Sequence, residues 1–211
     1  IAHRRIKQRG GEFVIRMEDL DLVTSARTWA LRQLVDLAAV GVNSDLVVVY
    51  QSERFEIYRE LVRDLERRDL MYPCFCSRRE ISESASAPHG EIQIYGGRCR
   101  DLSVSQRAEL AQARPPAFRL RVEARVRDAG FVNDIVLLRN DGVPAYNLAV
   151  VVDDHLQGVT QVVRGDDLAH VTPSQMYLQS LLGYEHPEYV HLPLMVGPDG
   201  ERLAKRHGDV T

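Results

Sequence analysis

The sequence predicts an α/β fold of the doubly wound kind. Two short apolar runs carry this prediction: residues 148–152 end in an Asp-Asp-His sequence, and residues 160–163 end in Arg164. Such runs are typical of buried parallel strands, and α/β folds place their catalytic and binding residues at the carboxyl ends of these strands. The Thr172-Pro173 pair then predicts the start of a helix after the second run.

The first third of the chain predicts one strand and two helices. Residues 12–17 have the pattern of a strand that enters the acidic turn at residues 18–21, and Thr24 or Ser25 is expected to cap the helix that follows. The expected apolar stripe of that helix is Trp29, Leu34, Leu37 and Ala38, with Gly41 at its end. A second helix follows Ser52, and its predicted buried face is Phe55, Tyr58, Val62 and Leu65.

Turn residues divide the remainder of the chain into short elements. Residues 105–114 predict a helix, which Pro115-Pro116 ends, and residues 117–122 and 134–138 predict strands. The helix that begins at Thr172 is expected to end at Gly183, and residues 192–196 to form the last strand.

Composition sets broad limits on the function. With 211 residues and 45% hydrophobic content, the chain can form one large domain or one domain with an insertion. No apolar run approaches the length of a membrane span, so we expect no membrane partner. The net charge of −3 does not by itself indicate nucleic acid, although a local basic face is compatible with it. The odd cysteine count and the lack of a signal peptide predict a reducing, cytoplasmic location.

The three cysteines predict a metal site. Cys74 and Cys76 are one residue apart, and Cys99 follows a loop-like stretch, so three thiolates can occupy three corners of a tetrahedral zinc site. The fourth ligand is open. His89 is favoured by chemistry, because imidazole is a commoner zinc ligand than phenol, and Tyr95 is the rival. The alternative is three unrelated buried thiols.

A short basic segment near the end of the sequence predicts a phosphate site. Only Lys7 and Lys205 are lysine among the 27 basic residues, and Lys205 lies in Arg202-Leu203-Ala204-Lys205-Arg206. A lysine retained against such an arginine bias suggests a need for a compact charge on phosphate. The alternative is a solvated basic tail.

Six blocks, taken together and in order, resemble the glutamyl-tRNA synthetase family, and most closely its short branch that glutamylates the queuosine base of tRNA(Asp). They are residues 15–21, the Cys-x-Cys with Tyr-x-x-x-Cys, and residues 145–155, 158–165, 191–194 and 202–206. The resemblance implies a Rossmann-type class I synthetase catalytic core over residues 1–211. Residues 70–130 would interrupt it as an inserted zinc-bearing, acceptor-binding subdomain, with no anticodon-binding domain.

The resemblance also implies roles for particular residues. Residues 202–206 would be the KMSKS-type loop, with Lys205 as the catalytic contact to ATP phosphates. Glu18 would bind the α-ammonium of L-glutamate, Arg164 a substrate carboxylate, and Tyr146 would complete the pocket. One structural zinc would be held by Cys74, Cys76, Tyr95 and Cys99, and Mg²⁺ would accompany ATP. Asp153-Asp154-His155 looks structural in the family. The expected protein is a monomer that binds the anticodon loop of tRNA(Asp), with phosphate contacts from Arg78, Arg79, Arg98 and Arg100.

Other interpretations stay open. In one alternative, Glu18 is an acidic residue at the entry to a helix. In another, Arg164 is an ordinary ion-pair partner of Asp166 or Asp167. The family's HIGH-like segment has no counterpart here, so the first strand of the sheet is expected to be missing. The alternatives for the whole chain are a glutamyl-tRNA synthetase fragment that charges the tRNA 3′ end and a non-catalytic, zinc-bearing RNA-interaction remnant.

Overall fold

The computed structural model describes residues 1–23, 25–77, 79–81, 95–129 and 132–197. The positions of Thr24, Arg78, His89 and the loop at residues 202–206 lie outside these ranges. No helix within them is long and apolar enough to cross a membrane.

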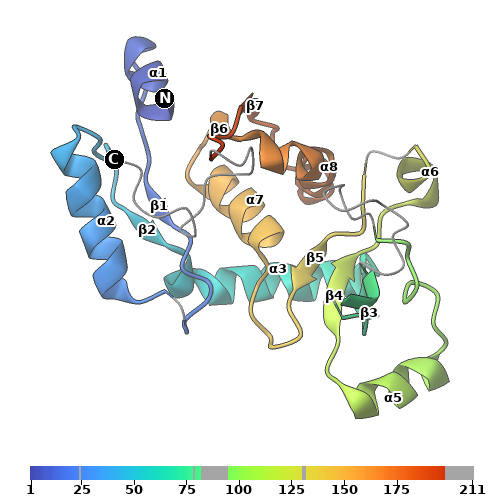
Figure 1. The fold of residues 1–211 in the computed structure, drawn as a ribbon. Coiled ribbons are helices and arrows are strands. Elements are labelled where there is room, and N and C mark those ends of the chain that lie inside the picture. Colours follow the sequence, from blue (N-terminus) through green and yellow to red (C-terminus); the bar gives the residue numbers. More distant parts are fainter. Residues whose placement is uncertain (24, 78, 82–94, 130–131, 198–211) are drawn as a thin grey trace.

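The described part of the molecule contains three small sheets (Figure 1). Strands β1 (Arg16–Met17) and β2 (Val49–Tyr50) are parallel, and so are β6 (Gln161–Gly165) and β7 (Glu188–Leu192). Strands β3 (Met71–Cys74), β4 (Ala117–Leu120) and β5 (Val136–Leu138) form an antiparallel sheet in that order. The fold is therefore mixed α/β.

Helices connect and cover these sheets. The α-helices are α1 (Ala2–Gln8), α2 (Arg27–Ala39), α3 (Phe55–Arg67), α5 (Val104–Ala113), α6 (Ala124–Arg127), α7 (Tyr146–Leu156) and α8 (Thr172–Leu182). The 3₁₀ helices are η1 (Gln51–Arg54) and η2 (Asp166–Val171). In Figure 1, α2 with the β1–β2 pair lies at one side of the molecule and α5 with the antiparallel sheet at the other, and α3 runs between them.

The predicted strand at residues 148–152 is wrong, because this run forms the middle of α7. All five of its residues are buried, since α7 passes through the core and contacts α3, β5 and α8. A helix that is surrounded by other elements is apolar on all faces, so its sequence has no 3.6-residue period and resembles a buried strand.

Other elements match their predictions closely. Helix α3 buries Tyr58, Val62 and Leu65 as expected, and α8 begins at Thr172 and ends at Gly183, which has a φ of 72°. Left-handed backbone at a helix end favours glycine because it has no Cβ to clash.

Three boundaries differ from their predictions. The first strand is limited to Arg16–Met17, and the last strand ends at Leu192, where it was expected to begin. Helix α2 begins after Ala26 without a side-chain cap, so Ser25 does not cap it. Trp29 and Ala38 are exposed on this helix, whereas Leu34 and Leu37 are partly buried.

The core consists of a main cluster and two smaller ones. The main cluster joins α3, α7 and α8 to the antiparallel sheet, around fully buried residues such as Leu65, Leu137 and Leu148. A second cluster surrounds the cysteines and includes Tyr72 and Phe75. The third lies between the β1–β2 pair and α2. The cysteine region therefore has its own apolar support.

Candidate functional site

A cavity of about 540 Å³ lies between the segment that contains β1, helix α7 and strand β6. The three residues predicted to bind glutamate, Glu18, Tyr146 and Arg164, all line it. Glu18 follows β1 directly, Arg164 is the next-to-last residue of β6, and Tyr146 is the first residue of α7. Both charged groups thus lie at carboxyl ends of parallel strands, where α/β folds bind ligands.

The strands and the extended segment that contribute residues to the cavity have few described partners. Strand β1 pairs only with β2, and β6 only with β7, in the part of the chain that the structure describes. Phe13 and Ile15, in the segment that leads into β1, turn their backbone N–H groups toward Asp45 and Ser44 beside β2. Glu12, Phe13 and Val14 of this segment line the cavity.

Arg164 is positioned by uncharged groups. It donates to Thr172 Oγ1 at 2.7 Å, to the Leu168 carbonyl at 3.4 Å and to His191 Nε2 at 3.4 Å. Its guanidinium also lies 4.9 Å from the centre of the Tyr189 ring. None of these partners is Asp166 or Asp167, so these contacts orient the guanidinium without neutralising its charge.

Arg16 is a site residue that the sequence interpretation missed. Its Nη1 donates to Asp154 Oδ1 at 2.8 Å and to Gln157 Oε1 at 3.0 Å, and its Nη2 lies 3.9 Å from Glu18 Oε1. Burial would lower the pKa of Arg16, but Asp154 above all, with Asp153 and Glu18, raises it instead. The signal was present in the sequence, because residues two apart on an extended chain share one face.

Glu18 faces the cavity with a partly solvated carboxylate. Its side chain is 48% exposed, yet burial raises its pKa, and Arg16 opposes that effect. Asp154 and Asp153 raise the pKa of Glu18 further, whereas Arg164 lowers it. Solvent at the open side limits the size of this shift. Burial and the charge of Glu18 also raise the pKa of Tyr146.

Asp153 and Asp154 serve as anchors in the described structure. Asp153 is fully buried and accepts hydrogen bonds from Tyr58 OH at 2.7 Å, Arg54 Nε at 2.7 Å and Gln51 Nε2 at 3.1 Å. These bonds tie α7 to η1 and α3. The geometry agrees with the structural role expected for the Asp-Asp-His sequence.

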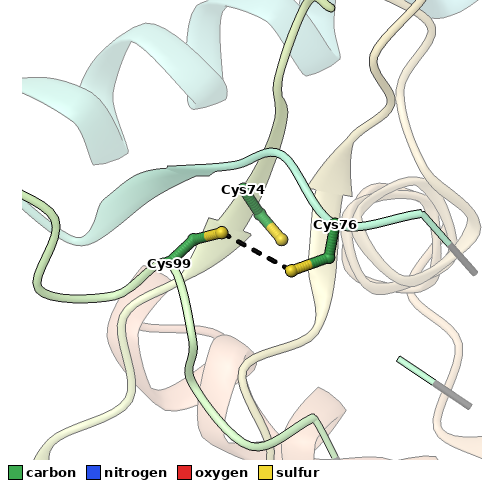
Figure 2. A group of neighbouring side chains, drawn as sticks. All are labelled: Cys74, Cys76 and Cys99. Atoms are coloured by element: carbon green, nitrogen blue, oxygen red, sulfur yellow. Dashed lines mark hydrogen bonds between the residues drawn. The ribbon is translucent and has the colours of Figure 1, made fainter. Parts of the chain in front are cut away.

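The three cysteines converge on one point from two segments of the chain, as Figure 2 shows. Their sulfur atoms all lie within 4.8 Å of one another, and Cys76 Sγ and Cys99 Sγ are 3.5 Å apart. Burial raises the pKa of the Cys76 thiol to about 12, and the neighbouring Cys99 and Cys74 add to this effect. Crowded thiols of this kind favour a cation that would offset the repulsion between thiolates.

Tyr95 completes the cluster. Its hydroxyl lies 3.4 Å from Cys74 Sγ and 3.9 Å from Cys76 Sγ, and it accepts a hydrogen bond from the backbone N–H of Cys99 at 2.8 Å. A zinc–sulfur distance of about 2.3 Å gives tetrahedral edges of about 3.8 Å, close to these separations. The four predicted ligands are thus assembled around one position, whereas His89 lies outside the described residues.

The arginines around the cluster differ in exposure. The Arg98 side chain is 72% exposed, whereas Arg100 is buried and pairs with Asp134 through Nη1 at 2.8 Å. The expectation that Arg100 contacts RNA phosphates is therefore wrong, because its charge is already used inside the fold.

Comparison with known proteins places this geometry in a family. Residues 4–211 match the model of the class I tRNA synthetase (E and Q) catalytic domain. A glutamyl-Q tRNA(Asp) synthetase from Nocardia farcinica is 51% identical over 96% of this chain and 68% of its own length. The chain belongs to the glutamyl-Q tRNA(Asp) synthetase family. A member from Symbiobacterium thermophilum is 41% identical over the whole of this chain and 73% of its own.

The glutamyl-Q tRNA(Asp) synthetase family consists of ligase-type enzymes, and it is related to glutamate–tRNA ligases. Glutamate–tRNA ligase 2 of Halorhodospira halophila is 38% identical over 97% of this chain but only 46% of its own length. The fold is that of a solved glutamate tRNA ligase from Elizabethkingia meningosepticum in complex with its amino acid. That match has a TM-score of 0.74 and 24% identity over 98% of this chain and 47% of that one. These relatives are thus longer than this chain.

Proposed function

We propose that the cavity binds L-glutamate for activation by ATP and that the glutamate is transferred to the queuosine base of tRNA(Asp). The observation that carries this proposal is the convergence of Glu18, Tyr146 and Arg164 on one cavity, with Glu18 directly after β1, Arg164 near the end of β6 and Tyr146 at the start of α7. A carboxylate, a phenol and a guanidinium that face one space suit a zwitterion with a second carboxylate.

The charges match the substrate group by group. The Glu18 carboxylate would bind the α-ammonium, and the Arg164 guanidinium would bind a substrate carboxylate through its fork of N–H groups. Arg16 is paired with Asp154 at 2.8 Å, so the proposal assigns Arg164 rather than Arg16 to the substrate. Tyr146 would close the pocket and donate a hydrogen bond.

Activation would follow in-line chemistry at ATP. A carboxylate oxygen of glutamate attacks the α-phosphorus, pyrophosphate leaves, and glutamyl-adenylate forms. Lys205, in the loop at residues 202–206, would hold the phosphates of ATP, and Mg²⁺ would arrive with the nucleotide. Catalysis is then mostly positioning and charge neutralisation. An acceptor hydroxyl next attacks the acyl carbon, and AMP leaves.

A structural zinc ion is the second part of the proposal. Cys74, Cys76, Cys99 and Tyr95 would hold it, because their donor atoms fit the edges of a tetrahedron. Elemental analysis should find about one zinc per chain, and Cys74→Ser should lose both metal and solubility, since a structural site supplies folding energy. Zinc-free protein from zinc-supplemented cultures would contradict this part.

We infer that queuosine is the acceptor from the names of the relatives. The antiparallel sheet and the cysteine cluster would contact the tRNA. The test uses full-length enzyme, labelled glutamate, and tRNA(Asp) with or without queuosine. We expect label to require queuosine and to persist on tRNA that lacks its 3′-terminal adenosine. Label that requires this adenosine would overturn the assignment.

Charging of the tRNA 3′ end is the second candidate, because a glutamate–tRNA ligase is also similar over nearly the whole chain. It predicts efficient labelling of unmodified tRNA(Glu) in the same assay. A non-catalytic RNA-binding role predicts no glutamate-dependent exchange between ATP and pyrophosphate in the full-length protein.

A further inference from the structure

Arg119 lies beside the cysteine cluster on the neighbouring strand. It is a β4 residue opposite Tyr72 of β3, and Cys74 pairs with Ala117 in the same ladder. Its guanidinium carbon is 3.9 Å from the centre of the Tyr95 ring. Arg119 is only 8% exposed, so its charge acts on the cluster without much screening by water.

The charge of Arg119 has no carboxylate partner in the part of the chain that the structure describes. Its Nη1 donates to the backbone carbonyl of Asp134 at 2.8 Å, and its buried Nε has no hydrogen-bond partner there. The carboxylate of Asp134 is already occupied: it accepts from Arg100 Nη1 at 2.8 Å and from Tyr72 OH at 2.6 Å. A buried guanidinium with only neutral partners is unfavourable unless an anion lies nearby.

The metal cluster would supply that anion. Zinc carries two positive charges, so three cysteine thiolates leave a net charge of −1 if Tyr95 is neutral and −2 if it is ionised. One adjacent cation therefore brings the buried cluster close to neutrality. This step rests on the proposed zinc site.

We propose that Arg119 is the counter-cation of the cysteine cluster and a positioning residue for its metal. Its charge would stabilise the anionic metal-bound cluster, and its stacking on Tyr95 would orient the phenol toward the metal position. The described structure shows no other guanidinium stacked on this ring. Arg119 therefore links β4 to the metal centre.

The experiment compares metal affinity in the wild type, Arg119→Met, Arg119→Lys and the control Arg121→Met. Arg121 is two residues further along and also carries a buried Nε, but its Nη1 lies 3.7 Å from the Asp101 carboxylate and its guanidinium lies 5.1 Å from the Tyr72 ring, so it has a carboxylate partner and does not stack on Tyr95. Zinc affinity is measured by competition with a chromophoric chelator. Co²⁺-substituted protein gives the thiolate-to-metal absorption bands.

We expect Arg119→Met to weaken zinc binding by about 10- to 100-fold, the usual range for outer residues of a metal site. Arg119→Lys should recover part of the loss, because it restores charge but not the planar stacking. Arg121→Met should stay within about threefold of the wild type. Thermal unfolding of the zinc-saturated proteins checks that each variant folds, and the lysine variant keeps the comparison usable if the methionine variant does not.

Two negative results have different meanings. Wild-type affinity and cobalt bands in Arg119→Met would overturn the role of Arg119 and leave the zinc site intact. A wild type that binds neither metal would overturn the zinc site and this inference with it.

Discussion

At the scale of single residues, Arg16 is the cation that lies among three carboxylates beside the cavity. It contacts Asp154 at 2.8 Å and lies 3.9 Å from both Asp153 and Glu18, and its side chain is 14% exposed. Three carboxylates in one region repel one another unless a cation lies among them. Arg16 thus allows Glu18 to remain available while Asp154 is neutralised inside the fold.

This role predicts a non-additive effect on stability. Arg16→Met should lower the free energy of unfolding by about 3 to 5 kcal/mol, because it leaves the buried Asp154 carboxylate unpaired. The double variant Arg16→Met/Asp154→Asn should recover much of this loss, since the unpaired charge is then removed. Urea unfolding of the wild type, Arg16→Met, Asp154→Asn and the double variant measures both effects. Simple addition of the two single effects would show that the pair is not coupled.

The raised pKa of Glu18 predicts a second effect, with a definite sign. The folded protein keeps Glu18 protonated to a higher pH than the unfolded chain does, so its contribution to stability falls as pH rises from the ordinary value of about 4.3 through the raised pKa. Glu18→Gln should therefore be more stable than the wild type at neutral pH, and the difference should vanish near pH 4. Arg16, Asp153, Asp154, Arg164 and Tyr146 face this group and are unchanged between the two proteins.

The matched control for Glu18 has the opposite sign. The pKa of Glu188 is lowered by its hydrogen bond from Gln161 and by Arg9 and Arg5. Glu188→Gln should therefore be less stable than the wild type at neutral pH, and this loss should disappear as pH falls through the lowered pKa. Urea unfolding at several pH values tests both variants. Equal pH dependence in Glu18→Gln and the wild type would contradict the shift of Glu18.

At the scale of secondary structure, α7 joins the core to the cavity. Its first residue, Tyr146, and its Asp154 line the cavity, while Leu148 and Val151 face the main cluster. A helix fixed on both sides can hold the cavity wall in place, so packing errors in α7 should affect the whole domain.

Leu148→Ala tests this position of α7. The side chain is fully buried, so we expect a loss of about 2 to 5 kcal/mol in the free energy of unfolding from lost burial and the resulting cavity. Leu156→Ala is the control on the same helix, because that side chain is 51% exposed and should cost at most about 0.5 kcal/mol. If residues 148–152 were a surface element, the two losses would be similar.

At the scale of the whole molecule, the cavity joins parts that are far apart in the sequence. Its lining comes mainly from residues 11–18 and from residues 146–164, together with Ala2, Ile6 and Leu46. The chain spans 68% of the Nocardia farcinica relative.

An activity assay tests the proposed role of Lys205. The full-length enzyme should show glutamate-dependent exchange between ATP and pyrophosphate, because the proposed reaction forms glutamyl-adenylate from ATP. In the full-length enzyme, Lys205→Ala should lower the rate by roughly 100-fold or more, as for the loss of one preorganised charge contact in the transition state. No exchange by the full-length enzyme would contradict the proposed activation, and a change in glutamate affinity alone would place Lys205 outside the phosphate site.

Local patterns determined much of this protein from the sequence alone. The amphipathic α3, the glycine that ends α8 and the Cys-x-Cys and Tyr-x-x-x-Cys spacings follow from interactions within a few residues of one another. The six ordered blocks were sufficient to identify the family, because each block depends only on which residues occur and on their order along the chain.

The tertiary structure decided what depends on distant partners. Residues 148–152 form a helix only because α3, β5 and α8 surround them, and an apolar run contains no period that could reveal this. Arg16 acquires its role from Asp154, which lies 138 positions away in the sequence. Arg119 likewise meets Tyr95 only because β3 and β4 pair. Burial and charge pairing arise between segments, so they belong to the folded chain and not to any local stretch of it.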